Sequence, residues 1–187
     1  MTPRVRVVQV DLATLTALAA GDLAAARACS PVALPDGFDQ PDWRSTWAMR
    51  RDQVAVDPRH AAWVTGLLLD EDRQEVVGRA GFHEPPDADG VVEVGYAVDP
   101  AWRRRGYGRA ALAWLVDRAR REPSVRAVRA CISPDNAASL ATIRPFGFRH
   151  VGDEWDEEDG LEQVWLLDVG DVGDADGDPG GGAAQQA

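Results

Sequence analysis

The chain has 187 residues, of which 45% are apolar, and this size suits one domain with a single buried core. It contains no run of about eighteen apolar residues that could form a transmembrane helix. The formal net charge of −11 comes from the C-terminal part, since 12 of the 31 acidic residues lie between Asp153 and Asp178, and the near-neutral body before them lacks the basic surface that non-specific nucleic-acid binding requires.

The first half of the chain predicts one strand, three helices and a hairpin. Alanine and leucine are frequent in residues 12–28, and the break at Gly21-Asp22 divides this stretch into two short helices. A proline-rich loop follows, after which Asp42 can cap a helix that ends before Pro58. The expected strands of this half are residues 4–10 and the hairpin pair 61–69 and 75–82.

The second half predicts four strands and two helices. The first of these strands follows the hairpin pair and completes a three-stranded meander with it. Residues 106–121 carry an apolar stripe at helical spacing. The other expected elements are the meander strand 91–98, a buried strand 125–132, a short helix 134–143 and a closing strand pair 146–151 and 161–169. We expect residues 1–169 to form one domain and the Gly/Asp-rich residues 170–187 to be a disordered tail.

The order of these elements predicts the fold class. Hairpin-connected strands pair antiparallel, whereas residues 91–132 form a strand–helix–strand unit whose strands pair in parallel. We therefore expect an α/β (α+β) fold, with a mixed, mostly antiparallel sheet of six to seven strands and helices on both faces.

A glycine-rich turn stands between a strand and a helix. Gly106 and Gly108 follow three consecutive arginines. Glycine lets the backbone approach a ligand closely, and the unpaired N–H groups of the helix start favour an anion there. Arginines beside such a turn add charge-assisted hydrogen bonds to phosphate. The pattern indicates a phosphate site, with a solvated arginine loop as the alternative.

The same glycines also match the dinucleotide fingerprint Gly-x-Gly-x-x-Gly/Ala, through Gly106, Gly108 and Ala111. That fingerprint places its glycines directly after the strand and an acidic residue about twenty positions later. Here residues 99–105 intervene, and Arg126 stands nearest to the acidic position. The sequence therefore disfavours hydride transfer with a nicotinamide cofactor.

The segment 93–108 resembles the acetyl-CoA motif of the GNAT superfamily of N-acetyltransferases. The family pattern Arg/Gln-x-x-Gly-x-Gly/Ala is matched by Arg103, Gly106 and Gly108, and a second motif is matched by residues 136–139 and 146–148. Glu-x-Gly-Tyr at residues 93–96 is similar to the ribosomal-protein-alanine acetyltransferase branch. The resemblance implies a GNAT-like sheet whose central strands, 91–98 and 125–132, splay apart.

The resemblance also implies acetyl-CoA (CoA) as the cofactor and no metal. Its pantetheine arm is expected in the gap between the splayed strands, and its pyrophosphate at the glycine turn. The implied cofactor-binding residues are Tyr96, Ala97, Val98, Arg103, Arg104, Arg105, Gly106, Tyr107, Gly108, Arg109, Asn136 and Ser139.

The implied reaction is direct attack of an amine on the thioester, which needs a base, an oxyanion donor and a proton for the thiolate. The backbone N–H of Tyr96 is the expected donor. Glu93 is the candidate base, because burial in an apolar strand raises the pKa of a carboxyl group; an orienting role and an exposed position are its alternatives. Many members carry a tyrosine acid where this chain has Ile143, so Ser139 is the candidate acid, with capping or packing as its alternative.

The acceptor side is less well defined by the sequence. His83 and Glu84 are rivals for the base and candidate substrate-binding residues, together with Trp43 and Trp47, although aromatics four residues apart are more often core. Residues 153–159 are expected to form an acidic loop between the last two strands. Such a loop can attract a cationic amine, but a solvated loop without a role is favoured.

The expected function is transfer of an acetyl group to a primary amine of a small molecule or a protein N-terminus. The alternative is a non-catalytic acyl-CoA-binding sensor or scaffold. The N-terminus lacks the apolar stretch of a secretory signal, and Cys29 and Cys131 follow no paired spacing. We therefore expect a cytoplasmic monomer or homodimer that binds neither nucleic acid nor membrane, while a disulfide between the two cysteines stays open.

Overall fold

The computed structural model describes residues 2–38, 40–157 and 160–170. Seven strands form a sheet in the order β1-β2-β3-β4-β5-β7-β6. Only β4 and β5 pair in parallel among the named strands, so the mixed, mostly antiparallel sheet is confirmed. The strands are β1 Val5–Val8, β2 Gly66–Asp70, β3 Glu75–Phe82, β4 Val91–Val98, β5 Ala127–Ile132, β6 Arg149–Asp156 and β7 Gly160–Asp168.

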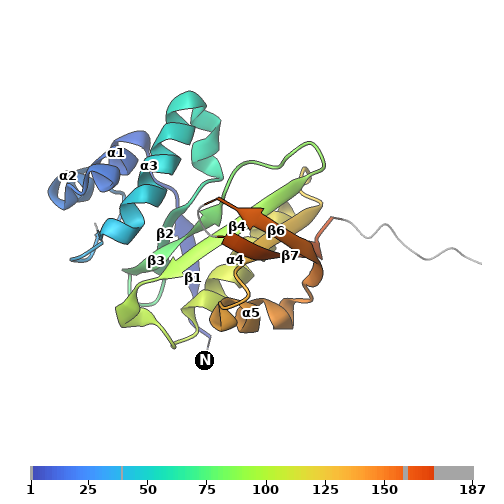
Figure 1. The fold of residues 1–187 in the computed structure, drawn as a ribbon. Coiled ribbons are helices and arrows are strands. Elements are labelled where there is room, and N and C mark those ends of the chain that lie inside the picture. Colours follow the sequence, from blue (N-terminus) through green and yellow to red (C-terminus); the bar gives the residue numbers. More distant parts are fainter. Residues whose placement is uncertain (1, 39, 158–159, 171–187) are drawn as a thin grey trace, which may run out of the picture.

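Helices cover both faces of the sheet, as expected (Figure 1). They are α1 Leu12–Ala20, α2 Leu23–Cys29, α3 Pro41–Val56, α4 Tyr107–Arg121 and α5 Ala137–Ile143. One apolar cluster joins Leu112 and Leu115 of α4 to Val92 and Val94 of β4. A second cluster joins α1, α2 and α3 to the other face of β2 and β3. The sheet thus has an α4–α5 face and an α1–α3 face, each with its own core.

Polar caps set the bounds of the first two helices where the sequence indicated a break. The Asp11 side chain accepts a hydrogen bond from the Thr14 N–H at 2.8 Å, and Asp22 accepts one from the Ala25 N–H at 2.9 Å. Between them Gly21 ends α1 with a φ of 71°, which few residues other than glycine adopt readily. The predicted division of residues 12–28 into two helices is therefore confirmed.

The structure corrects three expected element bounds. The helix α3 begins at Pro41 with Gln40 before it and without a side-chain cap, so Asp42 is not its cap. Proline suits this first position because its φ is already helical. Residues 61–65 precede the strand β2, since Pro58–Ala62 forms a 3₁₀ turn. Strand β6 extends to Asp156, so Asp153 to Asp156 pair with β7 rather than form a loop.

Residues 158–159 of the expected acidic loop and residues 171–187 of the expected tail lie outside the described residues. Among the residues that the structure does describe, no helix has both the length and the apolar content that crossing a membrane requires.

Candidate active site

The strands β4 and β5 separate after a short parallel pairing. They pair only over residues 91–93 and 127–129. Further along, β4 stays paired with β3 and β5 stays paired with β7. The expected splay of the central strands is therefore present, and it leaves the facing edges of β4 and β5 without each other as partners.

Backbone hydrogen bonds show which residues of β4 face this gap. The His83 N–H donates to the Glu93 carbonyl oxygen, and the Asp99 N–H donates to the Val77 carbonyl oxygen. These bonds show that the backbone N–H and C=O groups of the odd-numbered residues of β4 point toward β3. Because backbone groups alternate along an antiparallel pair, Tyr96 and Val98 present theirs to the gap.

This alternation also shows where the backbone groups of Ala97, an expected cofactor contact, point. Ala97 lies opposite Arg79 in the β3–β4 pairing, so its backbone groups face β3 and not the gap. The Val98 carbonyl oxygen accepts a hydrogen bond from Nε of Arg103 at 3.1 Å. Of the three strand residues expected at the cofactor, Tyr96 therefore offers a free backbone edge, and Val98 has its carbonyl tied to the arginine turn.

The helix α4 begins after this turn with no side-chain cap. Gly106 precedes the helix with a φ of 86°, and Arg104 also adopts a positive φ, of 58°. A left-handed conformation at a non-glycine residue costs on the order of 1–3 kcal/mol. The first N–H groups of α4 lack intrahelical acceptors, and the helix dipole favours an anion at this end. The surrounding Arg103, Arg104, Arg105 and Arg109 are exposed, and Arg105 also lies over the Trp102 ring at 5.1 Å.

Tyr107 fixes the start of α4 to the sheet. Its side chain is only 3% exposed, and its hydroxyl donates to Oδ2 of Asp70 at 2.5 Å. Asp70 is 1% exposed at the end of β2 and also accepts from the Arg73 guanidinium and from two backbone N–H groups. The Tyr107 side chain therefore holds the turn in place, and only its backbone is available to a cofactor.

A cleft of about 770 Å³ opens at the gap and reaches both faces of the sheet. Val94 and Tyr96 pack toward the α4–α5 face, so alternation sends Glu93 and Gly95 toward the α1–α3 face. Similarly, Val128 and Ala130 of β5 pack toward α4, and Cys131 points the other way. Its polar lining includes Arg50, Arg79, His83, Glu93, Tyr96, Cys131, Ser139, Glu154 and Glu162.

Glu93 lies in this cleft beside two basic groups. Its Oε1 is 3.0 Å from Nδ1 of His83, and its Oε2 is 3.4 Å from Nε of Arg129. Burial on its own raises the pKa of Glu93, but His83 and Arg129 outweigh burial and hold that pKa below its ordinary value. The expectation of a raised pKa is therefore wrong, and Glu93 is an ionised carboxylate at neutral pH.

The His83 ring lies against Gly95 of β4. A methyl group placed on Gly95 would come within 2.7 Å of Nε2 of His83. The glycine thus lets the imidazole approach the strand, one residue before the Tyr96 N–H. Glu84, the other rival for the base, is exposed and accepts from Nε2 of Gln53 at 3.3 Å. It is not among the residues that line the cleft.

The Tyr96 hydroxyl is a polar group that the sequence did not single out. It is buried and has no hydrogen-bond partner among the described residues. Burial raises the pKa of the Tyr96 phenol, an effect that the nearby hydroxyls of Thr142 and Ser139 oppose. Ser139 lines the cleft at the start of α5, where its N–H donates to Oδ1 of Asn136 at 3.1 Å. Asn136 therefore caps this helix, and the phenol is a protonated donor next to Ser139.

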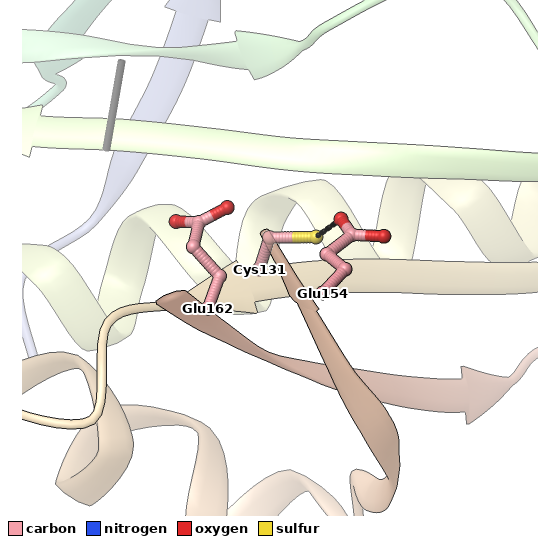
Figure 2. A group of neighbouring side chains, drawn as sticks. All are labelled: Cys131, Glu154 and Glu162. Atoms are coloured by element: carbon pink, nitrogen blue, oxygen red, sulfur yellow. Dashed lines mark hydrogen bonds between the residues drawn. The ribbon is translucent and has the colours of Figure 1, made fainter. Parts of the chain in front are cut away.

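An acidic wall, formed by Glu154 and Glu162, borders the cleft beside Cys131 (Figure 2). The thiol is 3.3 Å from Oε1 of Glu154, which also pairs with Arg129. The ligand atoms of Cys131, Glu154 and Glu162 lie within 4.8 Å of one another, a spacing that a metal ion could bridge. Burial and the carboxylates raise the pKa of Cys131 to about 12. The thiol therefore stays protonated at neutral pH. The Arg129 guanidinium balances the negative charge of Glu154 beside it.

The expected substrate residues Trp43 and Trp47 lie in the core instead of the cleft. Trp43 is 7% exposed and Trp47 is fully buried, and both pack against Phe38 at centroid distances of 4.8 and 6.0 Å. The core alternative for this aromatic pair is therefore correct. The same helix, α3, contributes Arg50 to the cleft, and strand β3 contributes Arg79. The sequence did not single out either arginine, although Arg79 interrupts the apolar residues of β3 as Glu93 interrupts those of β4.

The comparisons with known proteins agree with this geometry. Residues 27–148 match the family model described as Acetyltransferase (GNAT) family. The uncharacterized N-acetyltransferase YjdG of Bacillus subtilis (strain 168) is 33% identical over 82 residues, or 44% of this chain and 49% of that protein. The match thus spans about half the length of this curated relative.

Two solved structures show the same fold. Mycobacterium smegmatis RimJ in complex with CoA-disulfide has 19% identity and a TM-score of 0.62 over 88% of this chain and 82% of its own. Ribosomal-protein-S5-alanine acetyltransferase from Vibrio fischeri has 16% identity and a TM-score of 0.60 over 89% of this chain and 93% of its own. Because the family model covers more than half of the chain, including the gap, the arginine turn and α5, this chain belongs to the GNAT family of acetyltransferases.

Proposed function

We propose that this chain transfers an acetyl group from acetyl-CoA to a primary amine of a small molecule or of a protein N-terminus. One observation carries the proposal. The cleft at the β4–β5 gap contains the Glu93–His83 pair and Tyr96, and the uncapped start of α4 lies beside Tyr96, whose Cε2 would be 3.5 Å from a methyl group on Gly108.

The residues present fit acetyl-CoA. The uncapped N–H groups of α4 and the exposed arginines suit a pyrophosphate. The free edge of β4 at Tyr96 suits the amide groups of pantetheine, and α5, with Asn136 and Ser139, borders the same gap. When bound, acetyl-CoA supplies a thioester, whose carbonyl carbon is open to attack by an amine.

We assign the base to His83 and the orienting role to Glu93. The carboxylate accepts from Nδ1 of the imidazole, which fixes the tautomer with a free Nε2. That nitrogen lies over Gly95 and can take a proton from the attacking amine. The low pKa of Glu93 supports this division of roles. A weakly basic carboxylate is a poor proton acceptor, but as an anion it accepts the hydrogen bond that orients the imidazole.

The other two requirements are met on the gap side of β4. The Tyr96 N–H faces the gap and would donate to the oxyanion. The Tyr96 hydroxyl and Ser139 border the same space, and either O–H group can give a proton to the departing thiolate. The raised pKa of Tyr96 keeps its hydroxyl protonated at neutral pH.

The proposal is tested by following release of the CoA thiol with acetyl-CoA and a panel of amines, amino acids and peptides. We expect turnover with at least one class and an N-acetylated product by mass spectrometry. His83→Gln should lower kcat by roughly 10²- to 10⁴-fold with little change in the KM for acetyl-CoA. His150→Gln is the matched control, because that histidine pairs with Asp153 on β6 and does not line the cleft. Tight CoA binding without acetylation of any amine would instead indicate a non-catalytic acyl-CoA-binding module.

A further inference from the structure

Two neighbouring arginines line the acceptor side of the cleft. Arg50 of α3 is only 4% exposed, and Arg79 of β3 is half-buried and lies over the Trp43 ring at 5.4 Å. Both belong to the cleft lining. Burial, together with the positive charge of Arg50, lowers the pKa of Arg79 to about 10. The two guanidinium groups are therefore close enough to repel each other.

Neither arginine forms an ion pair with a carboxylate among the residues that the structure describes. Arg50 donates only to neutral groups, which include Thr65, Gln53 and the His83 carbonyl oxygen. Nε of Arg79 is buried and finds no acceptor within the described part of the chain. Glu84 and Glu93 favour the charged form of Arg50 from a distance, whereas Arg79 is affected by burial and by the charge of Arg50. Burying an unpaired charge is costly, and a bound anion would relieve that cost chiefly for Arg79.

The position of the pair separates it from the expected cofactor site. Arg79 points to the α1–α3 face, where it meets Trp43, whereas the uncapped start of α4 belongs to the opposite face. Glu93 and His83 lie on the same face as the two arginines. An anion held by Arg50 and Arg79 would therefore belong to the acceptor and not to acetyl-CoA.

We propose that Arg50 and Arg79 form an anion subsite and that the acceptor is an amine that also carries a carboxylate. This inference rests on the proposed acetyl transfer at the same site. A single negative charge suits the cleft, because the acidic wall of Glu154 and Glu162 disfavours a more highly charged group. The carboxylate can belong to a free amino acid or to an acidic side chain near a peptide N-terminus.

The strand register gives the spacing of the backbone positions that carry the two groups of the subsite. The amine is placed by His83 over Gly95, and Arg79 lies opposite Ala97, two residues further along β4. Two residues of a strand span about 6–7 Å. The arginines therefore favour a carboxylate separated from the amine by several bonds over the short spacing of glycine.

The test compares each acceptor with its own primary amide. A series of ω-amino acids of increasing length forms one arm, and peptides with Asp or Asn at the second position form the other, which distinguishes the two sources. For the acceptor length with the highest activity, we expect kcat/KM of the acid to exceed that of its amide by about tenfold to a hundredfold. Arg79→Gln should reduce that ratio to less than about threefold. Arg79→Lys, which keeps the charge without the fork, should give an intermediate ratio.

Arg6→Gln is the matched control, because Arg6 is exposed on β1 and does not line the cleft. It should keep the wild-type ratio. Equal turnover of acid and amide by the wild-type protein would overturn the anion subsite and leave acetyl transfer intact, and this result needs no variant to fold. A ratio that Arg79→Gln leaves unchanged would also overturn it. Absence of turnover for every amine, acid or amide, would instead remove the proposed function and this inference with it.

Discussion

At the scale of single residues, the candidate site depends on charged groups that change one another's properties. Glu93 is partly buried, yet His83 and Arg129 lower its pKa, which is why we propose it as an anchor for the imidazole and not as a base. Cys131, on the next strand, shows the opposite balance, because burial and two nearby carboxylates raise its pKa to about 12. Each group therefore has a protonation state that its neighbours determine.

The close approach of His83 to β4 predicts the effect of Gly95→Ala. The added methyl group would meet Nε2 of His83 at 2.7 Å, and the ring can move aside while the strand stays paired. We expect kcat to fall by roughly ten- to a hundredfold, because a displacement of about 1 Å at a catalytic group has effects of this size. Stability should change little, as measured by thermal unfolding.

Gly152→Ala is the matched control for this substitution. A methyl group there would meet no atom within 4 Å, and the residue also lies in a strand. This variant should keep both activity and stability. Wild-type activity in Gly95→Ala would show that the position of the His83 ring is unimportant.

The sequence was informative about site residues where a charge interrupts an apolar strand or a known motif exists. Glu93 and the arginine turn were found in these ways. Arg79 and Arg129 also interrupt apolar strands, but only the sheet register shows that they lie on the same face as Glu93. Arg50 could not have been found, because its helix also carries charges at exposed positions, and burial depends on contacts distant in the sequence.

At the scale of elements, we propose that cofactor binding depends on the start of α4. Gly108→Glu should weaken CoA binding on the order of a hundredfold, because it places a negative charge beside the expected pyrophosphate. Gly108→Ala is the matched control, since its methyl group would only touch Cε2 of Tyr96 at an ordinary 3.5 Å. Isothermal titration calorimetry with CoA measures both. Similar affinity in the two variants would contradict the assignment of the site.

The hydrogen bond from Tyr107 to Asp70 predicts a pH-dependent contribution to stability. Burial, followed by the bond to Asp70 and its negative charge, raises the pKa of Tyr107 to about 12, against about 10 in an unfolded chain. The folded state therefore holds this proton more tightly. The resulting stability is fully present below about pH 10 and is lost as the pH rises toward about 12.

Urea unfolding of wild type and Tyr107→Phe at about pH 8 and about pH 11 tests this. At the lower pH the variant should lose about 1–2 kcal/mol, because Asp70 loses one donor but keeps Arg73 and two backbone N–H groups. At the higher pH the difference should shrink, since Tyr107 ionises in the unfolded wild-type chain while the folded state still holds its proton. A difference that does not depend on pH would contradict the raised pKa.

The elements themselves followed from local patterns in most of the chain. Strand β4 has the predicted bounds, and the glycine and aspartate signals located α1 and α2. The acidic residues of β6 were misassigned to a loop because their composition is typical of solvated turns. Their strand conformation comes from pairing with β7. In this pairing Glu154 lies opposite Glu162. Such pairing is a tertiary effect that local propensity does not contain.

At the scale of the whole molecule, the proposed donor and acceptor sites lie on opposite faces of the sheet, and the β4–β5 gap connects them. Helices α4 and α5 cover one face, and α1 to α3 cover the other (Figure 1). The side chains of His83, Glu93 and the paired arginines belong to the α1–α3 face. This arrangement predicts direct transfer from thioester to amine, with both substrates bound at once. It gives no role to Cys131 as a nucleophile, because its thiol stays protonated at neutral pH.

The most direct test of this account is the intact mass of the protein, measured together with CoA thiol release, after mixing with acetyl-CoA before and after an amine is added. We predict neither thiol release nor acetylated protein before the amine, followed by continuous release and an acetylated amine after it. One equivalent of thiol released without amine, with one acetyl group attached to Cys131, would contradict direct transfer through the gap.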